Sequence, residues 1–125
     1  MIIAVGIDIV DVKRMSRTLK TYKGRFREKY FTSSEREYCS SKSKPAQHYA
    51  VRFAAKEALY KALGESWPQG VGHRDVEVVS SDEGSPSLRL SNELEEVFAK
   101  KGMTNIHLSL SHTAKLAVAV VIVES

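Results

Sequence analysis

The segment between Pro45 and Gly64 constrains the fold of this chain more than any other feature. Proline is tolerated in the first turn of a helix and glycine commonly ends one, so the two residues bound a predicted helix over about 45–63. The chain has 125 residues, which is the size of one domain. We therefore expect a single domain over 1–125, packed around this long central helix.

The N-terminal residues 2–10, IIAVGIDIV, are apolar and β-branched, which predicts a buried strand. Alternation along a strand separates two faces. One face carries Ile3, Val5, Ile7 and Ile9; the other carries Ala4, Gly6, Asp8 and Val10. Asp8 therefore shares its face with two very small neighbours, which leaves space beside its carboxylate.

The remaining patterns predict shorter helices and four more strands. Helices are expected over 12–23, where Val12, Met15, Leu19 and Tyr22 recur on one side, from the capping box Thr32 to Glu35, and from Ser91 to Gly102. Strands are expected over 76–79, 88–90, 105–112 and 116–123, with turns at 82–85 and 113–115. The later strands are close enough in sequence for hairpin pairing, so we predict an α+β fold with a mainly antiparallel sheet.

The composition restricts the class of protein. Lys and Arg number 19 against 15 Asp and Glu, a net charge of +4, in a composition typical of a folded domain. Cys39 is the only cysteine, which excludes an internal disulfide and a multi-cysteine zinc site and fits a reducing compartment. No apolar run reaches the ~18 residues that span a bilayer, and the start MIIAVGIDIVD lacks the basic region of a signal peptide. We expect a cytoplasmic protein without a membrane segment.

The predicted helix over 45–63 carries two charged patterns. At about 100° per residue, Arg52 and Lys56 lie on one side and form a charged face. Glu57 and Lys61 lie on another side with the i, i+4 spacing of a helix ion pair. The helix alone favours a surface salt bridge, because structural ion pairs are common. The alternative is a carboxylate and an ammonium that point into a cleft.

Asp8 strengthens that alternative. A carboxylate in a buried strand needs a cation, hydrogen-bond donors or a metal, and a core Lys or Arg is one possible partner. Two carboxylates from separate elements with a nearby lysine are also a common way to hold magnesium against a phosphate. Magnesium takes one or two carboxylates and leaves its other positions to water and phosphate oxygens. The pair Asp8 and Glu57 is therefore a candidate magnesium site.

Two other groups could contribute to chemistry. Ser111 and His112 are adjacent in a predicted strand and point to opposite faces, so they make a poor catalytic dyad. His112 is then either a phosphate or substrate contact at a strand end, or a half-buried histidine without a role. Cys39 has no nearby histidine in the sequence, and we expect it to be inert.

Basic residues dominate positions 12–29, where Glu28 is the only acid. Such a surface is either a solvated face or a binding site for an acidic partner. Nucleic acid and an acidic protein both qualify as partners, but the chain has no recognisable nucleic-acid motif and no series of stacking aromatics.

Five motifs run over nearly the whole chain. They are Gly6-Ile7-Asp8-Ile9-Val10; Phe31-Thr32 with Glu35; Arg52-Phe53-Ala54-Ala55-Lys56-Glu57-Ala58 followed by Lys61-Ala62-Leu63-Gly64; Asp75-Val76-Glu77-Val78; and Ser109-Leu110-Ser111-His112-Thr113. As a set they resemble the holo-acyl-carrier-protein synthases, which are 4′-phosphopantetheinyl transferases.

The resemblance implies transfer of 4′-phosphopantetheine from coenzyme A to a serine of apo acyl carrier protein, with release of adenosine 3′,5′-bisphosphate and magnesium as cofactor. It implies Asp8 and Glu57 as magnesium ligands and Lys61 as a catalytic lysine near the pyrophosphate. It also implies a coenzyme A pocket that contains Arg52, Lys61, Gly64 and His112, and carrier-protein docking through Arg14, Arg17 and Lys20. Glu57 and a metal-bound water are both candidates for the catalytic base. Bacterial members are typically homotrimers that serve fatty acid and lipid biosynthesis, so we expect a homotrimer.

The chain departs from the family pattern at three places, one of which is Thr113, where some members carry an Asp. Many members carry a basic residue at the position of Ser85 in Gly84-Ser85-Pro86, so one phosphate contact is expected to be missing. The loop from Glu65 to Gly72 is longer than usual, and we expect it to alter the rim of the coenzyme A pocket. Two rival interpretations are a non-enzymatic basic module that binds nucleic acid through 13–29, and a different magnesium-dependent pyrophosphate enzyme with the same carboxylate pair.

Overall fold

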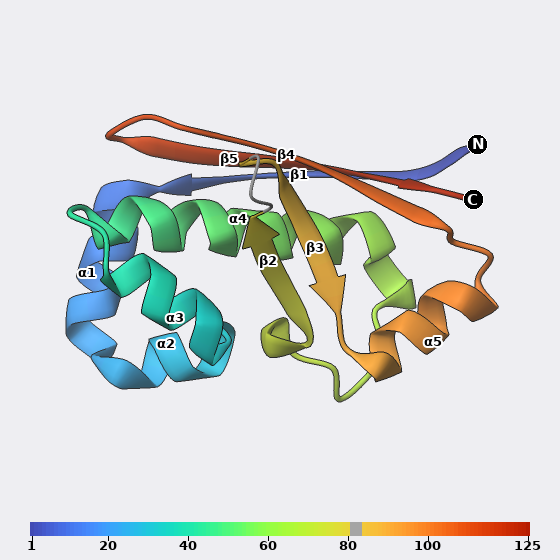
Figure 1. Ribbon diagram of the computed structural model, residues 1–125, viewed down its shortest axis with the longest axis horizontal. Coiled ribbons are helices and arrows are strands. Elements are labelled where there is room, and N and C mark those ends of the chain that lie inside the picture. Colours follow the sequence, from blue (N-terminus) through green and yellow to red (C-terminus); the bar gives the residue numbers. More distant parts are fainter. Residues whose placement is uncertain (81–83) are drawn as a thin grey trace.

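The helix predicted between Pro45 and Gly64 is present in the computed structural model as α4 (Pro45–Leu63), and the other elements surround it (Figure 1). The structure describes residues 1–80 and 84–125. The other helices are α1 (Val12–Tyr22), α2 (Gly24–Tyr30), α3 (Ser33–Ser40) and α5 (Asn92–Lys100), with 3₁₀ turns η1 (Gly64–Ser66) and η2 (His73–Asp75). The strands are β1 (Ile2–Asp11), β2 (Val76–Ser80), β3 (Pro86–Leu90), β4 (Asn105–His112) and β5 (Leu116–Glu124).

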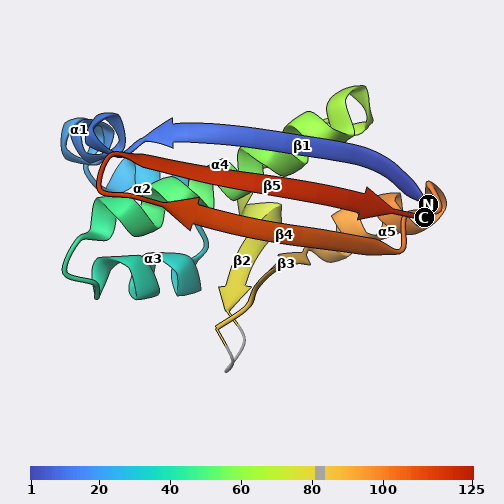
Figure 2. The same cartoon turned by 90° about the horizontal axis from the view of Figure 1, so that it is seen from above.

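The strands form two antiparallel sheets, which confirms the predicted α+β class. The larger sheet has the order β1-β5-β4, with β5 in the middle and both chain ends at the same edge of the molecule (Figure 2). The smaller sheet is the hairpin β2-β3. Positions 82 and 83 of the turn expected at 82–85 lie outside the described residues. Among the described residues, no helix is both long and apolar enough to cross a membrane.

Strand β1 lies unusually close to α4 at Gly6. A Cβ atom at this position would lie 1.8 Å from the carbonyl oxygen of Ala58, so only glycine permits the approach. Asp8 follows two residues later on the same face of the strand. The close approach at Gly6 therefore brings the carboxylate of Asp8 toward α4.

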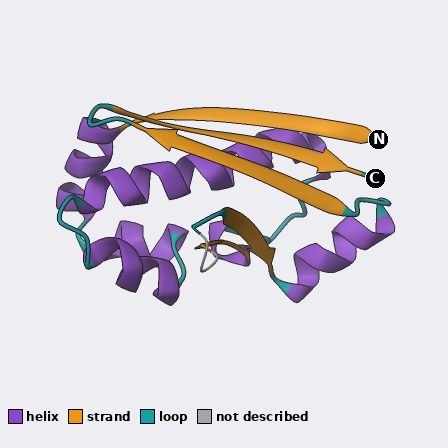
Figure 3. Cartoon of the chain, turned by 45° about the horizontal axis from the view of Figure 1, so that its top comes forward, coloured by secondary structure: helices purple, strands orange, loops and turns teal. Residues whose placement is uncertain are grey.

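The other face of β1 is exposed, contrary to the prediction of a buried strand. Helices cover one side of the larger sheet only (Figures 1 and 3). On the opposite side Ile3, Val5, Ile7 and Ile9 are 42–61% exposed. The alternation of faces was predicted correctly, but in the single chain only the face of Gly6 and Asp8 packs against a helix.

Helix α1 is held by a shorter apolar stripe than predicted. Val12, Met15 and Leu19 are buried, whereas Tyr22 is 51% exposed at the last turn. The helix is capped by Asp11, whose Oδ1 accepts from the backbone N–H of Arg14 at 2.8 Å. Helix α2, which the sequence patterns did not predict, continues the basic segment after α1.

The charged face expected on α4 is buried rather than solvated. The Lys56 side chain is fully buried, and Nζ donates to Glu35 Oε1 at 2.6 Å and to the backbone carbonyls of Tyr30 and His73 at 2.7 and 3.0 Å. Burial lowers the pKa of the Lys56 ammonium, and Glu35 opposes that shift. Lys56 therefore ties α2, α3 and η2 to the central helix.

The Glu35 carboxylate completes this cluster. Its Oε1 also accepts from the backbone N–H of Thr32 at 2.9 Å, which closes the predicted capping box, and Oε2 accepts from the N–H of Val78 at 2.9 Å. Cys39, on the same helix, is fully buried, and burial raises the pKa of its thiol to about 11. A protonated and inaccessible thiol is a poor nucleophile.

Candidate active site

A pocket of about 510 Å³ opens where β1, α1 and α4 meet, and it is lined by three carboxylates: Asp8, Glu57 and Asp11, the cap of α1. Asp8 comes from β1 and Glu57 comes from the middle of α4. The pocket wall also holds Arg14, Met15, Thr18, Phe26 and Phe53. The tertiary structure thus brings positions 8 and 57 together, as the magnesium-site hypothesis requires.

Asp8 and Glu57 have different partners. Lys61 Nζ donates to Asp8 Oδ1 at 2.7 Å, and the His73 Nε2 atom lies 2.6 Å from Glu57 Oε1. The surface salt bridge between Glu57 and Lys61, favoured from the helix alone, is therefore not formed. Lys61 instead reaches across to the strand, with its side chain 53% exposed.

These contacts set the charge states of Lys61 and Glu57. The hydrogen bond to Asp8 raises the pKa of Lys61, so the lysine is an ammonium at neutral pH. The hydrogen bond to His73 lowers the pKa of Glu57, despite its partial burial. Glu57 is therefore ionised at neutral pH, as a ligand for a hard cation must be.

Asp8 and Glu57 suit magnesium as a pair of ligands, but the described residues do not surround a metal with protein ligands alone. Among the described residues, no group of three or more His, Cys, Asp or Glu side chains is placed to hold a metal. Within that part of the chain, hydrogen bonds reach only one oxygen of each carboxylate, Oδ1 of Asp8 and Oε1 of Glu57. Two partly free carboxylates suit magnesium, which takes one or two protein ligands and fills its other positions from water and phosphate.

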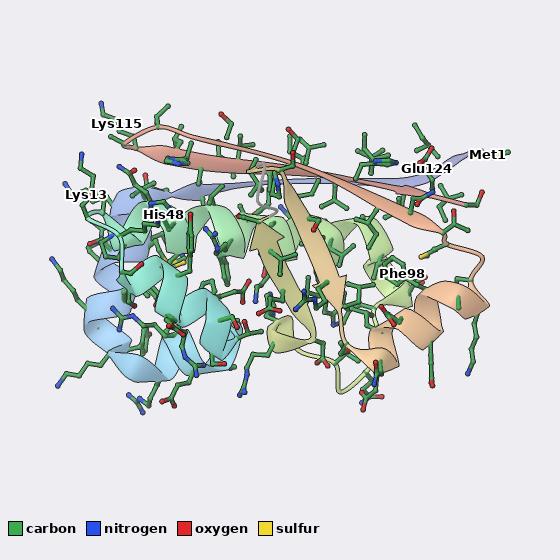
Figure 4. The ribbon with its side chains drawn as sticks, in the orientation of Figure 1. Met1, Lys13, His48, Phe98, Lys115 and Glu124 are labelled. Atoms are coloured by element: carbon green, nitrogen blue, oxygen red, sulfur yellow. The ribbon has the colours of Figure 1, made fainter. Side chains whose placement is uncertain are left out.

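Arg52 and His112 lie outside this pocket, in a separate cationic cluster. The Arg52 guanidinium stacks over the Tyr38 ring at 4.3 Å, and the ring centroids of His48 and His112 are 6.0 Å apart. Burial and the positive charges of Arg52, His112 and Lys42 lower the pKa of His48. The cluster lies toward the N-terminal end of α4, where His48 is labelled in Figure 4.

Gly64 lies at the opposite end of α4, where it adopts a φ of +54° that favours glycine. Twelve residues of helix separate it from Arg52, a distance of roughly 18 Å. The residues that the resemblance implies for coenzyme A binding therefore do not line one pocket of a single chain. The loop that follows Gly64 folds back on itself, since Trp67 Nε1 donates to the carbonyl of Val71 at 2.9 Å.

The three basic residues implied in carrier docking are exposed on α1. Arg14 also lines the carboxylate pocket, whereas Arg17 and Lys20 do not. The basic helix therefore borders the pocket through its first turn and continues away from it.

His73 is the partner of Glu57 that the sequence patterns missed. It lies in a segment rich in glycine and predicted as a loop, 16 residues after Glu57. No local periodicity or ligand spacing connects the two positions, and only the packing of η2 against α4 does so.

Comparison with known proteins shows the family to which this chain is similar. The family model of the 4′-phosphopantetheinyl transferase superfamily matches residues 4–121. A holo-[acyl-carrier-protein] synthase of Geobacter metallireducens is 46% identical over 124 residues, covering 99% of this chain and 98% of that protein.

Solved structures agree with the sequence relatives. The holo-[acyl-carrier-protein] synthase of Neisseria meningitidis superposes with a TM-score of 0.92 at 30% identity and covers 100% of both chains. The Helicobacter pylori holo-[acyl-carrier-protein] synthase, in complex with coenzyme A, gives a TM-score of 0.82 at 32% identity over 96% of this chain and 99% of that one. Since the family model and these relatives each match nearly the full length, this chain belongs to the 4′-phosphopantetheinyl transferase superfamily.

Proposed function

We propose that this chain is a holo-[acyl-carrier-protein] synthase, which transfers 4′-phosphopantetheine from coenzyme A to a serine of apo acyl carrier protein. The observation that carries this function is the pocket that joins Asp8 of β1 and Glu57 of α4, in a chain whose full-length relatives are such synthases. The Helicobacter pylori relative, in complex with coenzyme A, supports coenzyme A as the donor. The basic helix α1 beside the same pocket supports an acidic protein as acceptor, rather than an independent nucleic-acid surface.

The reaction exchanges the phosphoanhydride bond of coenzyme A for a phosphodiester link to the carrier serine. The serine oxygen forms a bond to the β-phosphorus of coenzyme A, the bond from that phosphorus to the bridging oxygen breaks, and adenosine 3′,5′-bisphosphate leaves. Transfers of this kind depend on positioning and charge neutralisation more than on covalent help from the protein. A magnesium ion held by Asp8 and Glu57 would supply that neutralisation at the pyrophosphate.

The chain's own residues have distinct roles in this proposal. Lys61, an exposed ammonium next to Asp8, can turn toward the bridging oxygen and stabilise the charge that develops on it. Glu57 is ionised and can accept the serine proton. Arg52, His112 and Gly64 remain proposed contacts of coenzyme A, and their separation in one chain would be bridged by a long ligand or by a neighbouring subunit.

The mass of a carrier protein tests the function directly. Apo acyl carrier protein incubated with this protein, coenzyme A and magnesium is expected to gain one phosphopantetheinyl group. Omitting coenzyme A or chelating the magnesium should each prevent the gain. An unchanged carrier mass under complete conditions would contradict the proposed function, and salt-sensitive retention on a DNA column would then favour the nucleic-acid module.

We further propose that the exposed face of β1 binds other copies of this chain, in the homotrimer that the resemblance implies. Four large apolar side chains exposed in one row are more than a monomeric surface normally tolerates. Light scattering is expected to give three times the chain mass of 13.9 kDa. Val5→Lys combined with Ile7→Lys should reduce it to the monomer mass, and an unchanged mass would place the subunit interface elsewhere.

The cytoplasm is the proposed location of the enzyme. The support is chemical: the chain's one cysteine is a free, buried thiol, and such a thiol suits a reducing compartment.

If the carrier protein docks on α1, the positive charges of this helix should determine how tightly the carrier binds. Reversing Arg17 and Lys20 to glutamate is expected to raise KM for the carrier protein roughly tenfold, because each exposed ion pair is worth up to about 1 kcal/mol and reversal replaces attraction by repulsion. Such attraction is screened over ~8 Å at physiological salt, so the salt dependence of KM should flatten. Arg14 is left unchanged because it also lines the carboxylate pocket.

The matched control reverses Lys100 and Lys101, which are exposed at the end of α5 on the other side of the molecule (Figure 1). This variant has the same net charge and should bind the carrier normally. Neither variant should change KM for coenzyme A. If the α1 variant weakens coenzyme A and spares the carrier, α1 has been assigned to the wrong partner.

A further inference from the structure

Glu57 has two possible partners, and the structure selects one of them. Lys61 lies one helical turn further along α4, at the spacing that ordinarily pairs with a glutamate. The carboxylate instead contacts His73, at 2.6 Å between Glu57 Oε1 and His73 Nε2. Lys61 is thereby left to Asp8.

The position of His73 is fixed from both its backbone and its ring. Its carbonyl oxygen accepts a hydrogen bond from the buried Lys56 at 3.0 Å. The imidazole stacks nearly parallel to Phe53, at 5.6 Å and 6°, and meets the edge of Tyr30 at 4.9 Å and 84°. His73 therefore presents Nε2 to Glu57 from a rigid slot of aromatic rings.

The chemistry of the contact fixes its direction. An ionised carboxylate only accepts hydrogen bonds, so the His73 Nε2–H group is the donor and Glu57 Oε1 the acceptor. One oxygen of Glu57 is thereby held, and the other stays available in the pocket that also contains Asp8. A neutral imidazole is sufficient for this bond.

We propose that His73 is a positioning residue of this active site, which holds the Glu57 carboxylate for the divalent cation and keeps Lys61 paired with Asp8. The proposal rests on the proposed function, since it concerns the same metal and the same reaction. Without His73, Glu57 would be free to turn to Lys61 on its own helix. Both carboxylates would then lose the arrangement seen in the pocket.

Two substitutions separate the hydrogen bond from the packing of the ring. His73→Phe keeps an aromatic ring in the slot and removes the donor, whereas His73→Gln keeps an N–H donor and removes the ring. Both leave the backbone carbonyl available to Lys56. Arg74→Gln is the matched control, because Arg74 lies exposed in the same 3₁₀ turn.

Binding of Mn²⁺ in the presence of saturating coenzyme A, followed by calorimetry, is the main measurement. Losing an outer hydrogen bond to a metal ligand typically weakens metal binding by about 10- to 100-fold, and we expect that loss in His73→Phe. His73→Gln should recover most of the affinity, and Arg74→Gln should match the wild type. In His73→Phe, kcat at limiting magnesium should fall while KM for carrier protein stays unchanged.

The outcomes are distinguishable. If wild-type protein modifies the carrier and His73→Phe binds Mn²⁺ as tightly as it does, the positioning role is wrong and the proposed function stands. An equal loss in His73→Phe and His73→Gln, with unchanged melting temperatures, would also overturn the role, because restoring the donor would then have no effect. If wild-type protein binds no Mn²⁺ and transfers nothing, both proposals fail together.

Discussion

Replacing Asp8 by asparagine or Glu57 by glutamine is expected to lower the rate of transfer by at least roughly a hundredfold to a thousandfold, the usual cost of removing one group that stabilises transition-state charge. Each substitution preserves the shape of the side chain and removes the negative charge. Neither carboxylate lies in the main core, with side-chain exposures of 13% for Asp8 and 26% for Glu57, so both variants should stay folded. Initial rates of carrier modification at limiting magnesium measure the effect.

Glu96→Gln is the matched control, because Glu96 is an exposed acid on α5, away from the pocket. It loses the same charge and should retain the wild-type rate. A near wild-type rate in Asp8→Asn or Glu57→Gln would remove that residue from the proposed magnesium site. Loss of the native circular dichroism spectrum would instead identify a structural role.

Lys56→Met is expected to lower the free energy of unfolding by about 3–5 kcal/mol, the usual result of breaking a buried ion pair by removing one partner. The substitution leaves the Glu35 carboxylate buried and without its cation, and it also removes the donor to the carbonyls of Tyr30 and His73. A domain is typically stable by only 5–15 kcal/mol, so the loss is a large fraction of the total. Urea unfolding followed by circular dichroism measures it.

A second substitution identifies the physical cause. Lys56→Met combined with Glu35→Gln removes the unpaired charge and should recover part of the lost stability, so that the two changes are not additive. Lys61, whose side chain is 53% exposed, offers the contrast, and Lys61→Met should change stability by only about 0.2–1 kcal/mol. A cost below 1 kcal/mol for Lys56→Met would contradict the structural role of the buried pair.

The sequence predicted helix ends, the capping box and the two faces of β1, because each depends on residues close together in the chain. Pro45 and Gly64 bounded α4 correctly, and the capping box from Thr32 to Glu35 started α3 as expected. Alternation along 2–10 placed Asp8 on the face that packs against a helix. These features follow from backbone geometry and local hydrogen bonds, which act over at most a few residues.

The family motifs predicted more about the candidate site than the hydrophobic periodicity could. They selected Asp8 and Glu57 together, and the structure places both on one pocket. Local patterns alone favoured a salt bridge between Glu57 and Lys61, because the i, i+4 spacing is visible in the sequence and the competing partners are not.

Local sequence patterns predicted most of the helices and strands, with α2 as the exception, and the sequence states which of their residues carry charge. Which of these charges meet depends on the packing of the folded chain. Asp8 takes Lys61 because Gly6 lets β1 approach α4, and Glu57 takes His73 because the buried Lys56 and the ring of Phe53 hold η2 against the same helix. The physical reason is that a side chain's partner depends on distances between elements far apart in the chain, and these distances are set by packing of the whole core.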